Sequence, residues 1–255
     1  MFFIKKIKRR ILICLISVLL VCAVIVTACA VYLADYYKAD EKAIAAYLEL
    51  DTVTDGAVTQ NTLEDNTIIF LPEMPTDKGF IFYPGGKVEH TAYLPLMQAC
   101  AEQGIFCALV KMPFRLAVLD IHAADGIQAQ YPEIERWYIG GHSLGGSMAA
   151  SYLAKRTDKY EGLVLLGSYS TADLSESGLK VLTLYGSEDG VLNREKYESN
   201  RGNLPSGYTE KILDGGCHAY FGMYGAQEGD GSPTVTNEEQ IVWAADEIAD
   251  FLFTE

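Results

Sequence analysis

Ser143 lies in the segment of this chain whose residue types and spacing are most typical of a catalytic group. It is the central residue of Gly141-His142-Ser143-Leu144-Gly145, a G-x-S-x-G motif. A β-rich stretch over residues 136–139 precedes the motif and a helical pattern over residues 144–155 follows it, which is the strand–turn–helix context of a nucleophilic serine. Side chains at Gly141 and Gly145 would collide across so tight a turn, and the turn forces the serine backbone into a strained conformation. The pattern predicts an accessible Ser143 Oγ above a sheet.

A serine nucleophile needs a general base, and the chain has only four histidines. His90 begins a helical stretch, His122 lies within one, and His142 occupies the variable position beside the serine. His218 follows the last predicted strand, in the Gly-rich loop 214–218. Loops at the carboxyl ends of strands form the site in an open α/β sheet. Elimination and position therefore favour His218 as the base.

The base in turn needs a carboxylate to orient it, which is expected after a strand between the serine and the histidine. The strand predicted over residues 180–185 leads into Gly186-Ser187-Glu188-Asp189-Gly190. Asp189 is the preferred acid. Glu188 and Asp214 remain the alternatives.

Backbone N–H groups must also stabilise the oxyanion that forms when the serine attacks a carbonyl. One is expected from Leu144, the residue after the nucleophile, and the other from the loop Pro84-Gly85-Gly86-Lys87, which follows the predicted strand 79–83. Removing such a donor typically costs about 3–4 kcal/mol of transition-state stabilisation. Gly86 and Lys87 are both open as the second donor.

The elements that must position these groups alternate along the chain. Strands are expected at residues 67–71, 79–83, 105–111, 136–139, 162–166, 180–185 and 208–213, with a weak one near Val58, and helices at 91–103, 116–130, 144–155, 194–200 and 238–253. This alternation predicts an α/β fold with a mostly parallel central sheet and helices on both faces.

Little of the chain is left to cover the site. Only residues 167–179 separate two of the predicted strands, so we expect no large cap domain. Phe114, Tyr169, Tyr220 and Phe221 are candidates for the substrate pocket, although plain packing explains each of them equally well.

Residues 11–33 form an apolar run of 23 residues without a charge. As a helix this run would be roughly 34 Å long, enough to cross a hydrocarbon core of about 30 Å. The basic residues before it should stay in the cytoplasm, which places the rest of the chain outside. The expected organisation is a basic cytoplasmic N-terminus (1–10), a transmembrane signal-anchor helix (11–33), a juxtamembrane segment (34–56) and a catalytic domain (57–255).

A second interpretation of the N-terminus is a lipoprotein. Val26-Thr27-Ala28-Cys29 resembles a bacterial lipoprotein cleavage box, in which Cys29 would carry the lipid. Both interpretations tether the domain to the outer face of a membrane.

The charge balance excludes several partners. The formal net charge is −14, and all five basic residues of the first 34 positions lie before the apolar run, so the rest of the chain is more acidic still. An acidic body repels phosphate backbones, and we expect no nucleic-acid binding.

The sequence shows no ligand-type spacing of His or carboxylate residues, and we expect no metal and no cofactor.

The chain resembles an α/β-hydrolase from about Ala57 to its C-terminus. The segments FYPGGKVEHTAYLPLMQACAEQG, GGHSLGGSMAA, LYGSEDGV and GGCHAYFGMYGAQEGDG are similar to a small, lidless bacterial α/β-hydrolase group whose members often carry an N-terminal membrane segment. The resemblance implies Ser143, Asp189 and His218 as nucleophile, acid and base. Cys217 stands where an Asn is expected before the catalytic histidine.

Together these features predict a membrane-anchored serine hydrolase that cleaves a carboxylic ester or related acyl bond through an acyl-enzyme. A small-molecule or lipid-like ester is its expected substrate. Two alternatives remain open: an acyltransferase acting on an envelope lipid or glycan, and a catalytically inactive hydrolase fold used as a binding module.

Overall fold

The computed structural model describes residues 2–51 and 58–254, and the chain divides into two compact units on either side of the Tyr36–Tyr37 bond. The first unit consists mainly of helix α1 (Phe2–Ala34). Its stretch Leu12–Ala34 has 23 residues and a mean hydropathy of 3.1, with no buried side chains in its most apolar window. The expected apolar helix is therefore present, and it is long enough to cross a membrane.

The second unit begins earlier than the catalytic domain expected from the sequence. Its first helix, α2 (Glu41–Asp51), packs through the buried Ile44. Upstream of α2, Tyr37 pairs with the loop after β3: its N–H donates to Lys87 O at 2.8 Å, and Glu89 N–H donates to Tyr37 O at 3.0 Å. Much of the predicted juxtamembrane segment thus belongs to the folded unit, whereas the boundary at residue 57 lies outside the described residues.

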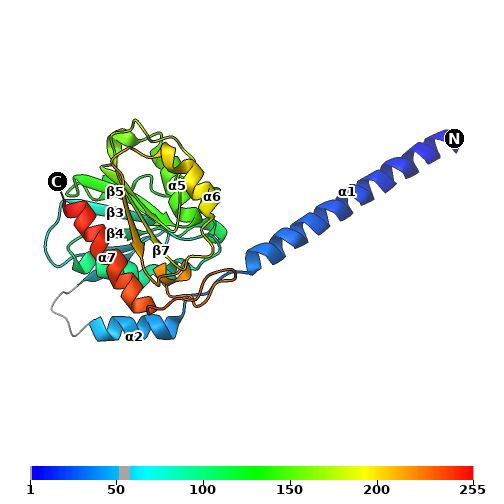
Figure 1. Cartoon of the computed structure of the whole chain (residues 1–255). Coiled ribbons are helices and arrows are strands. Elements are labelled where there is room, and N and C mark those ends of the chain that lie inside the picture. Colours follow the sequence, from blue (N-terminus) through cyan, green and yellow to red (C-terminus); the bar gives the residue numbers. More distant parts are fainter. Residues whose placement is uncertain (1, 52–57, 255) are drawn as a thin grey trace. The chain divides into compact units, whose positions relative to one another are not determined.

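A mixed sheet forms the centre of the second unit (Figure 1). In the described part of the chain its strand order is β1-β2-β4-β3-β5-β6-β7-β8. The pairs β1–β2 and β2–β4 are antiparallel, and all pairs from β4 to β8 are parallel. The strands are β1 (Thr59–Thr62), β2 (Ile68–Leu71), β3 (Lys78–Tyr83), β4 (Phe106–Leu109), β5 (Arg136–His142), β6 (Gly162–Leu166), β7 (Lys180–Gly186) and β8 (Thr209–Leu213). The mostly parallel sheet is confirmed.

Helices cover both faces of this sheet, as Figure 1 shows for α7 on one side and α5 and α6 on the other. Alternate residues of a strand point to opposite faces: Phe80 and Phe82 pack in the core beneath α3 and α7, whereas Ile81 and Tyr83 pack beneath α5. The helices are α3 (Leu94–Glu102), α4 (Ile127–Gln130), α5 (Leu144–Leu153), α6 (Arg194–Asn200) and α7 (Asn237–Phe253). Short 3-10 turns are η1 (His90–Tyr93), η2 (Pro113–Arg115), η3 (Ala117–Leu119), η4 (Thr157–Lys159), η5 (Arg201–Asn203) and η6 (Ala219–Phe221).

The prediction of one helix over residues 116–130 was wrong. The segment contains η3, turns and the four-residue α4 instead. The buried side chain of Tyr83 explains the difference: its hydroxyl accepts a hydrogen bond from Ala124 N–H at 3.0 Å and donates one to Ile121 O at 2.9 Å. A tertiary contact therefore satisfies backbone groups that a helix would have paired internally.

The site is not covered by a separate cap. Residues 167–179, between β6 and β7, are all described and contain only turns and bends. The absence of a large cap, expected from the length of this connection, is confirmed over these residues.

Candidate active site

The candidate residues lie in loops that follow the carboxyl ends of β3, β5, β6, β7 and β8. These five strands are parallel and adjacent in the sheet. Parallel strands bring their carboxyl ends to one edge, where ligands bind in open α/β sheets. The fold therefore gathers residues that lie far apart in the sequence.

Ser143 occupies the sharp turn between β5 and α5. Its backbone has φ 53° and ψ −121°, a conformation that L-residues rarely adopt. The turn is closed by Ser143 N–H, which donates to Leu166 O at 2.9 Å. A Cβ at Gly141 would lie 2.3 Å from Tyr83 O, and one at Gly145 would lie 2.2 Å from the same atom. Glycine is required at both positions because the loop backbone after β3 passes directly against them.

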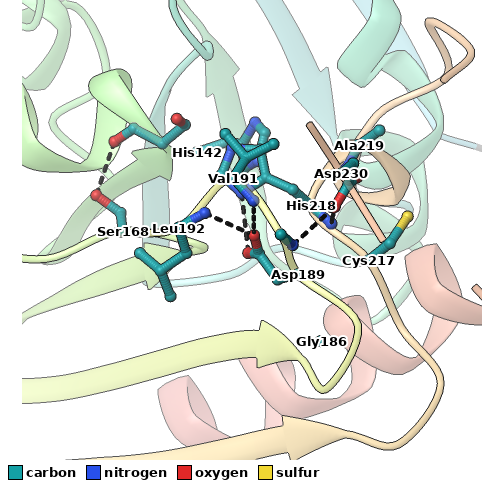
Figure 2. A network of polar contacts seen from close by, with 12 residues as sticks. His142, Ser168, Gly186, Asp189, Val191, Leu192, Cys217, His218, Ala219 and Asp230 are labelled. Carbon is teal, nitrogen blue, oxygen red and sulfur yellow. Dashed lines mark hydrogen bonds and ion pairs between the residues drawn. The ribbon is translucent and has the colours of Figure 1, made fainter. Parts of the chain in front are cut away.

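His218 and Asp189 form a buried pair. The distance from His218 Nδ1 to Asp189 Oδ2 is 2.9 Å, and their side chains are 1% and 0% exposed. The other carboxylate oxygen of Asp189 accepts the backbone N–H groups of Val191 at 3.0 Å and Leu192 at 2.7 Å (Figure 2). The loop after β7 thus holds the carboxylate rigidly beside the imidazole.

The alternative acids lie elsewhere. Glu188 and Asp214 are both exposed, and Ser187 Oγ hydrogen-bonds to each of them. The structure therefore brings Asp189, and neither of these two, to His218.

The remaining histidines are also placed by the structure. His90 lines a separate hollow beside the loop after β3. His122 is exposed and lies 3.6 Å from Asp125. Only His142 is near His218, and it is buried.

Ser143 and His218 line the same cleft, whose volume is about 230 Å³. His218 Nε2 is buried and has no hydrogen-bond partner among the described residues. The remaining lining residues mix apolar and small polar groups: Leu144, Ser147, Gly167, Ser168, Tyr169, Val191, Leu192 and Asn193. An unpartnered imidazole nitrogen beside a strained serine is the arrangement that proton transfer from a hydroxyl requires.

The structure separates the four aromatic residues considered for the pocket. Tyr169 lines the cleft. Phe114 is 61% exposed and lines the separate hollow of about 240 Å³ beside the β3 loop. Phe221 is fully buried against the His142 ring, and Tyr220 is not among the residues of the cleft. Local sequence could not predict which of these aromatic side chains lines the cleft, because the position of each side chain depends on which face of its loop packs inward.

The loop after β3 distinguishes its two candidate donors, Gly86 and Lys87. Lys87 N–H donates to Arg115 O at 2.8 Å, and Gly85 N–H donates to the Tyr93 hydroxyl at 3.1 Å. A Cβ added at Gly86 would lie 2.8 Å from the Leu144 side chain. Gly86 is therefore the loop residue that lies against Leu144 and has no assigned partner for its N–H among the described residues.

Asp230 belongs to the site although the sequence reasoning did not single it out. Its carboxylate accepts four backbone N–H groups: those of His218 at 3.1 Å, Ala219 at 2.8 Å, Gly190 at 3.1 Å and Gly231 at 3.0 Å. Burial would raise the pKa of Asp230, but these hydrogen bonds outweigh it and lower the pKa. The sequence feature that could have pointed to Asp230 is its position in the Gly229-Asp230-Gly231 turn, downstream of the loop that carries His218.

The base loop has a second buried support. Gln240 of α7 is fully buried, and its amide both accepts from Cys217 N–H at 3.0 Å and donates to Cys217 O at 2.7 Å. Burial, and then the nearby Asp230, raise the pKa of the Cys217 thiol to about 12. Cys217 is therefore a neutral packing residue at neutral pH.

Nowhere in the described ranges do three or more His, Cys, Asp or Glu residues gather as metal ligands would.

Comparisons with known proteins agree with this fold. The alpha/beta hydrolase family profile matches residues 79–242. No curated protein matches the chain.

Solved structures share the fold at low sequence identity. A predicted CIB-like hydrolase from Thermoplasma acidophilum is 17% identical, with a TM-score of 0.51 over 77% of this chain and 100% of that one. An esterase domain from Rhodothermus marinus is 12% identical, with a TM-score of 0.54 over 78% and 98%. A dienelactone hydrolase from Anabaena variabilis is 14% identical, with a TM-score of 0.52 over 77% and 96%.

Proposed function

This chain belongs to the alpha/beta hydrolase family, and we propose that it is a serine hydrolase that cleaves carboxylic esters through an acyl-enzyme. The observation that carries the proposal is the cleft shared by Ser143 and His218. There the imidazole is held by Asp189 at Nδ1, and its buried Nε2 has no partner among the described residues.

In the first half of the reaction, Ser143 Oγ attacks the ester carbonyl carbon while its proton passes to His218 Nε2. Asp189 keeps the Nδ1 proton in place and stabilises the imidazolium that forms. The tetrahedral intermediate then collapses: the bond to the alkoxy oxygen breaks, and His218 returns the proton to the leaving alcohol.

In the second half, His218 takes a proton from water, and the resulting hydroxide equivalent attacks the acyl-enzyme carbonyl. Collapse of this intermediate releases the carboxylic acid and returns the proton to Ser143 Oγ. The net reaction consumes one ester and one water and gives one acid and one alcohol.

The developing oxyanion needs donors aimed at it in both halves. We assign them to the backbone N–H groups of Leu144, at the start of α5, and Gly86. The positive end of the helix dipole adds to the stabilisation at Leu144. Lys87, the other loop candidate, already uses its N–H to bind Arg115 O.

The apolar stretch of α1 supports a membrane location. We propose that Leu12–Ala34 spans a membrane, with the basic N-terminus on the cytoplasmic side and the hydrolase unit outside. The cleft lacks a cap domain over residues 167–179, so small-molecule or lipid-like esters can reach the serine.

A fluorophosphonate probe tests the proposal, because it reacts covalently with activated serines. The full chain in detergent should be labelled, and Ser143→Ala should abolish labelling. His218→Ala should slow labelling by at least about 100-fold, since a general base contributes about 10²–10⁴-fold. Ser147→Ala is the matched control, because Ser147 lines the same cleft and should leave labelling intact. A folded wild type that does not react would exclude an activated serine.

A further inference from the structure

Two buried groups next to the catalytic residues have no role in the reaction described above. His142 precedes the serine and is 1% exposed, and Tyr93 of η1 is fully buried. The His142 ring lies against the His218 ring, with 4.4 Å between their centroids (Figure 2). His142 Nδ1 lies 2.8 Å from the Tyr93 hydroxyl.

The Tyr93 hydroxyl has two hydrogen-bond partners in this group, Gly85 N–H and His142 Nδ1. Gly85 N–H can only donate, so the Tyr93 oxygen accepts from it at 3.1 Å. His142 Nδ1 is the second hydrogen-bond partner of this oxygen, and His142 Nε2 is buried without a partner among the described residues. Burial raises the pKa of Tyr93. Burial and the adjacent His218 lower the pKa of His142 well below its usual value. Both groups are therefore neutral at neutral pH.

The group connects the two halves of the catalytic machinery. Gly85 N–H belongs to the peptide bond immediately before the one that carries Gly86 N–H, the assigned oxyanion donor, so anchoring it to Tyr93 limits where Gly86 N–H points. His142 packs against the imidazole that accepts the serine proton. One hydroxyl, that of Tyr93, thus contacts a residue from each side.

We propose that Tyr93 is a positioning residue. Its hydroxyl contacts Gly85 in the oxyanion loop and His142, whose ring packs against the base His218. These two contacts fix the oxyanion donor and the base relative to each other. The inference rests on the proposed function. It goes beyond it by assigning a role to groups that touch neither substrate nor the reacting atoms.

Tyr93→Phe tests the proposal, because it removes a single oxygen and keeps the buried ring. We expect kcat for an ester such as 4-nitrophenyl acetate to fall about 10- to 100-fold, since small misplacements of catalytic groups have effects of this size. KM should change less than about threefold. Tyr138→Phe is the matched control: Tyr138 is also buried, but its hydroxyl lies 3.5 Å from Leu252 O, away from the site.

A second variant keeps the test valid if Tyr93→Phe lowers the melting temperature. His142→Phe retains a packed ring and removes the hydrogen-bond partner that His142 Nδ1 gives the Tyr93 hydroxyl, and it should lower kcat by a similar factor. The double variant should be no worse than the poorer single variant, because both substitutions break one linked unit.

The outcomes separate this inference from the proposed function. If the wild type hydrolyses esters and Tyr93→Phe matches Tyr138→Phe in kcat, the positioning role is refuted while the serine hydrolase stands. Multiplicative effects of the two substitutions in the double variant would also refute it. A wild type that neither hydrolyses esters nor reacts with the fluorophosphonate would overturn both.

Discussion

Gly167, the first residue after β6, leaves the space that the His218–Asp189 pair occupies. A Cβ there would lie 2.8 Å from His218 Nδ1 and 3.1 Å from Asp189 Oδ2, and the backbone φ is +49°. Real Cβ atoms essentially never show the first distance, the second is tighter than most real Cβ contacts, and the pair is buried. At the residue scale, the pair therefore needs a glycine at position 167 to keep its place.

Gly167→Ala should lower kcat/KM for ester hydrolysis at least about tenfold, because the added methyl group displaces the imidazole from Asp189. The matched control is Gly178→Ala. Gly178 also has a positive φ, +72°, but nothing lies within 4 Å of its added Cβ. Both variants share the backbone strain of a left-handed alanine, about 1–2 kcal/mol. Equal kcat/KM values for the two variants would contradict this account of Gly167.

At the scale of elements, one carboxylate joins three of the segments that form the site. Asp230 accepts N–H groups from the acid loop (Gly190), from the base loop (His218 and Ala219) and from its own turn (Gly231). The acid loop and base loop follow different strands, β7 and β8. Asp230 therefore fixes their relative position, on which the 2.9 Å contact between His218 and Asp189 depends.

Asp230→Asn should lower the free energy of unfolding by about 1–3 kcal/mol, because an amide cannot accept all four hydrogen bonds. Activity should fall together with stability. Asp173→Asn is the control, since Asp173 is an exposed carboxylate that, among the residues the structure describes, accepts only from Ser175. Urea unfolding followed by tryptophan fluorescence measures both variants. A loss no greater than that of the control would show that the three segments hold together without Asp230.

The effect of Asp230 should also depend on pH. Its pKa in the folded protein is lowered, relative to an unfolded value of about 3.9. The stability it contributes is therefore fully present above that value and is lost as the pH falls through the lower folded-state pKa. We expect the difference in unfolding free energy between wild type and Asp230→Asn to be constant from about pH 5 to pH 8. It should begin to close below about pH 4.

At the scale of the whole molecule, the second compact unit has its own core and starts at Tyr37. Tyr37 pairs with the loop after β3 on both sides, through Lys87 O and Glu89 N–H. This loop carries the assigned oxyanion donor, Gly86. The segment before residue 58 therefore contributes to the site as well as joining the unit to α1.

Two truncations test this boundary. A chain of residues 35–255 should be soluble and should keep kcat/KM within about threefold of the full chain in detergent. A chain of residues 58–255 lacks α2 and Tyr37, and it should lose at least about tenfold in kcat/KM because the oxyanion loop loses two backbone hydrogen bonds. Full activity in the shorter chain would place the functional boundary near residue 57 after all.

The full chain should remain in the membrane pellet after a carbonate wash, in contrast to residues 35–255.

Local patterns determined much of this protein. The G-x-S-x-G motif around Ser143 is local in sequence, although the close approach that requires Gly141 and Gly145 comes from Tyr83 O at the end of β3. The buried parallel strands β6 and β7 are continuous apolar runs, and α6 and α7 follow helical periodicity, so their bounds agree with the predictions to within one residue. The 23-residue apolar stretch is likewise a property of composition and length.

Contacts between distant segments decided the rest. The Tyr83 hydroxyl kept residues 116–130 from forming one helix. Arg115 O occupied Lys87 N–H, and this left Gly86 as the candidate donor. Asp230, His142 and Tyr93 became part of the site only when the carboxyl ends of the strands came together. The physical reason is that a backbone or side-chain polar group takes whichever partner the packed fold presents, and that partner is a neighbour in space rather than in sequence.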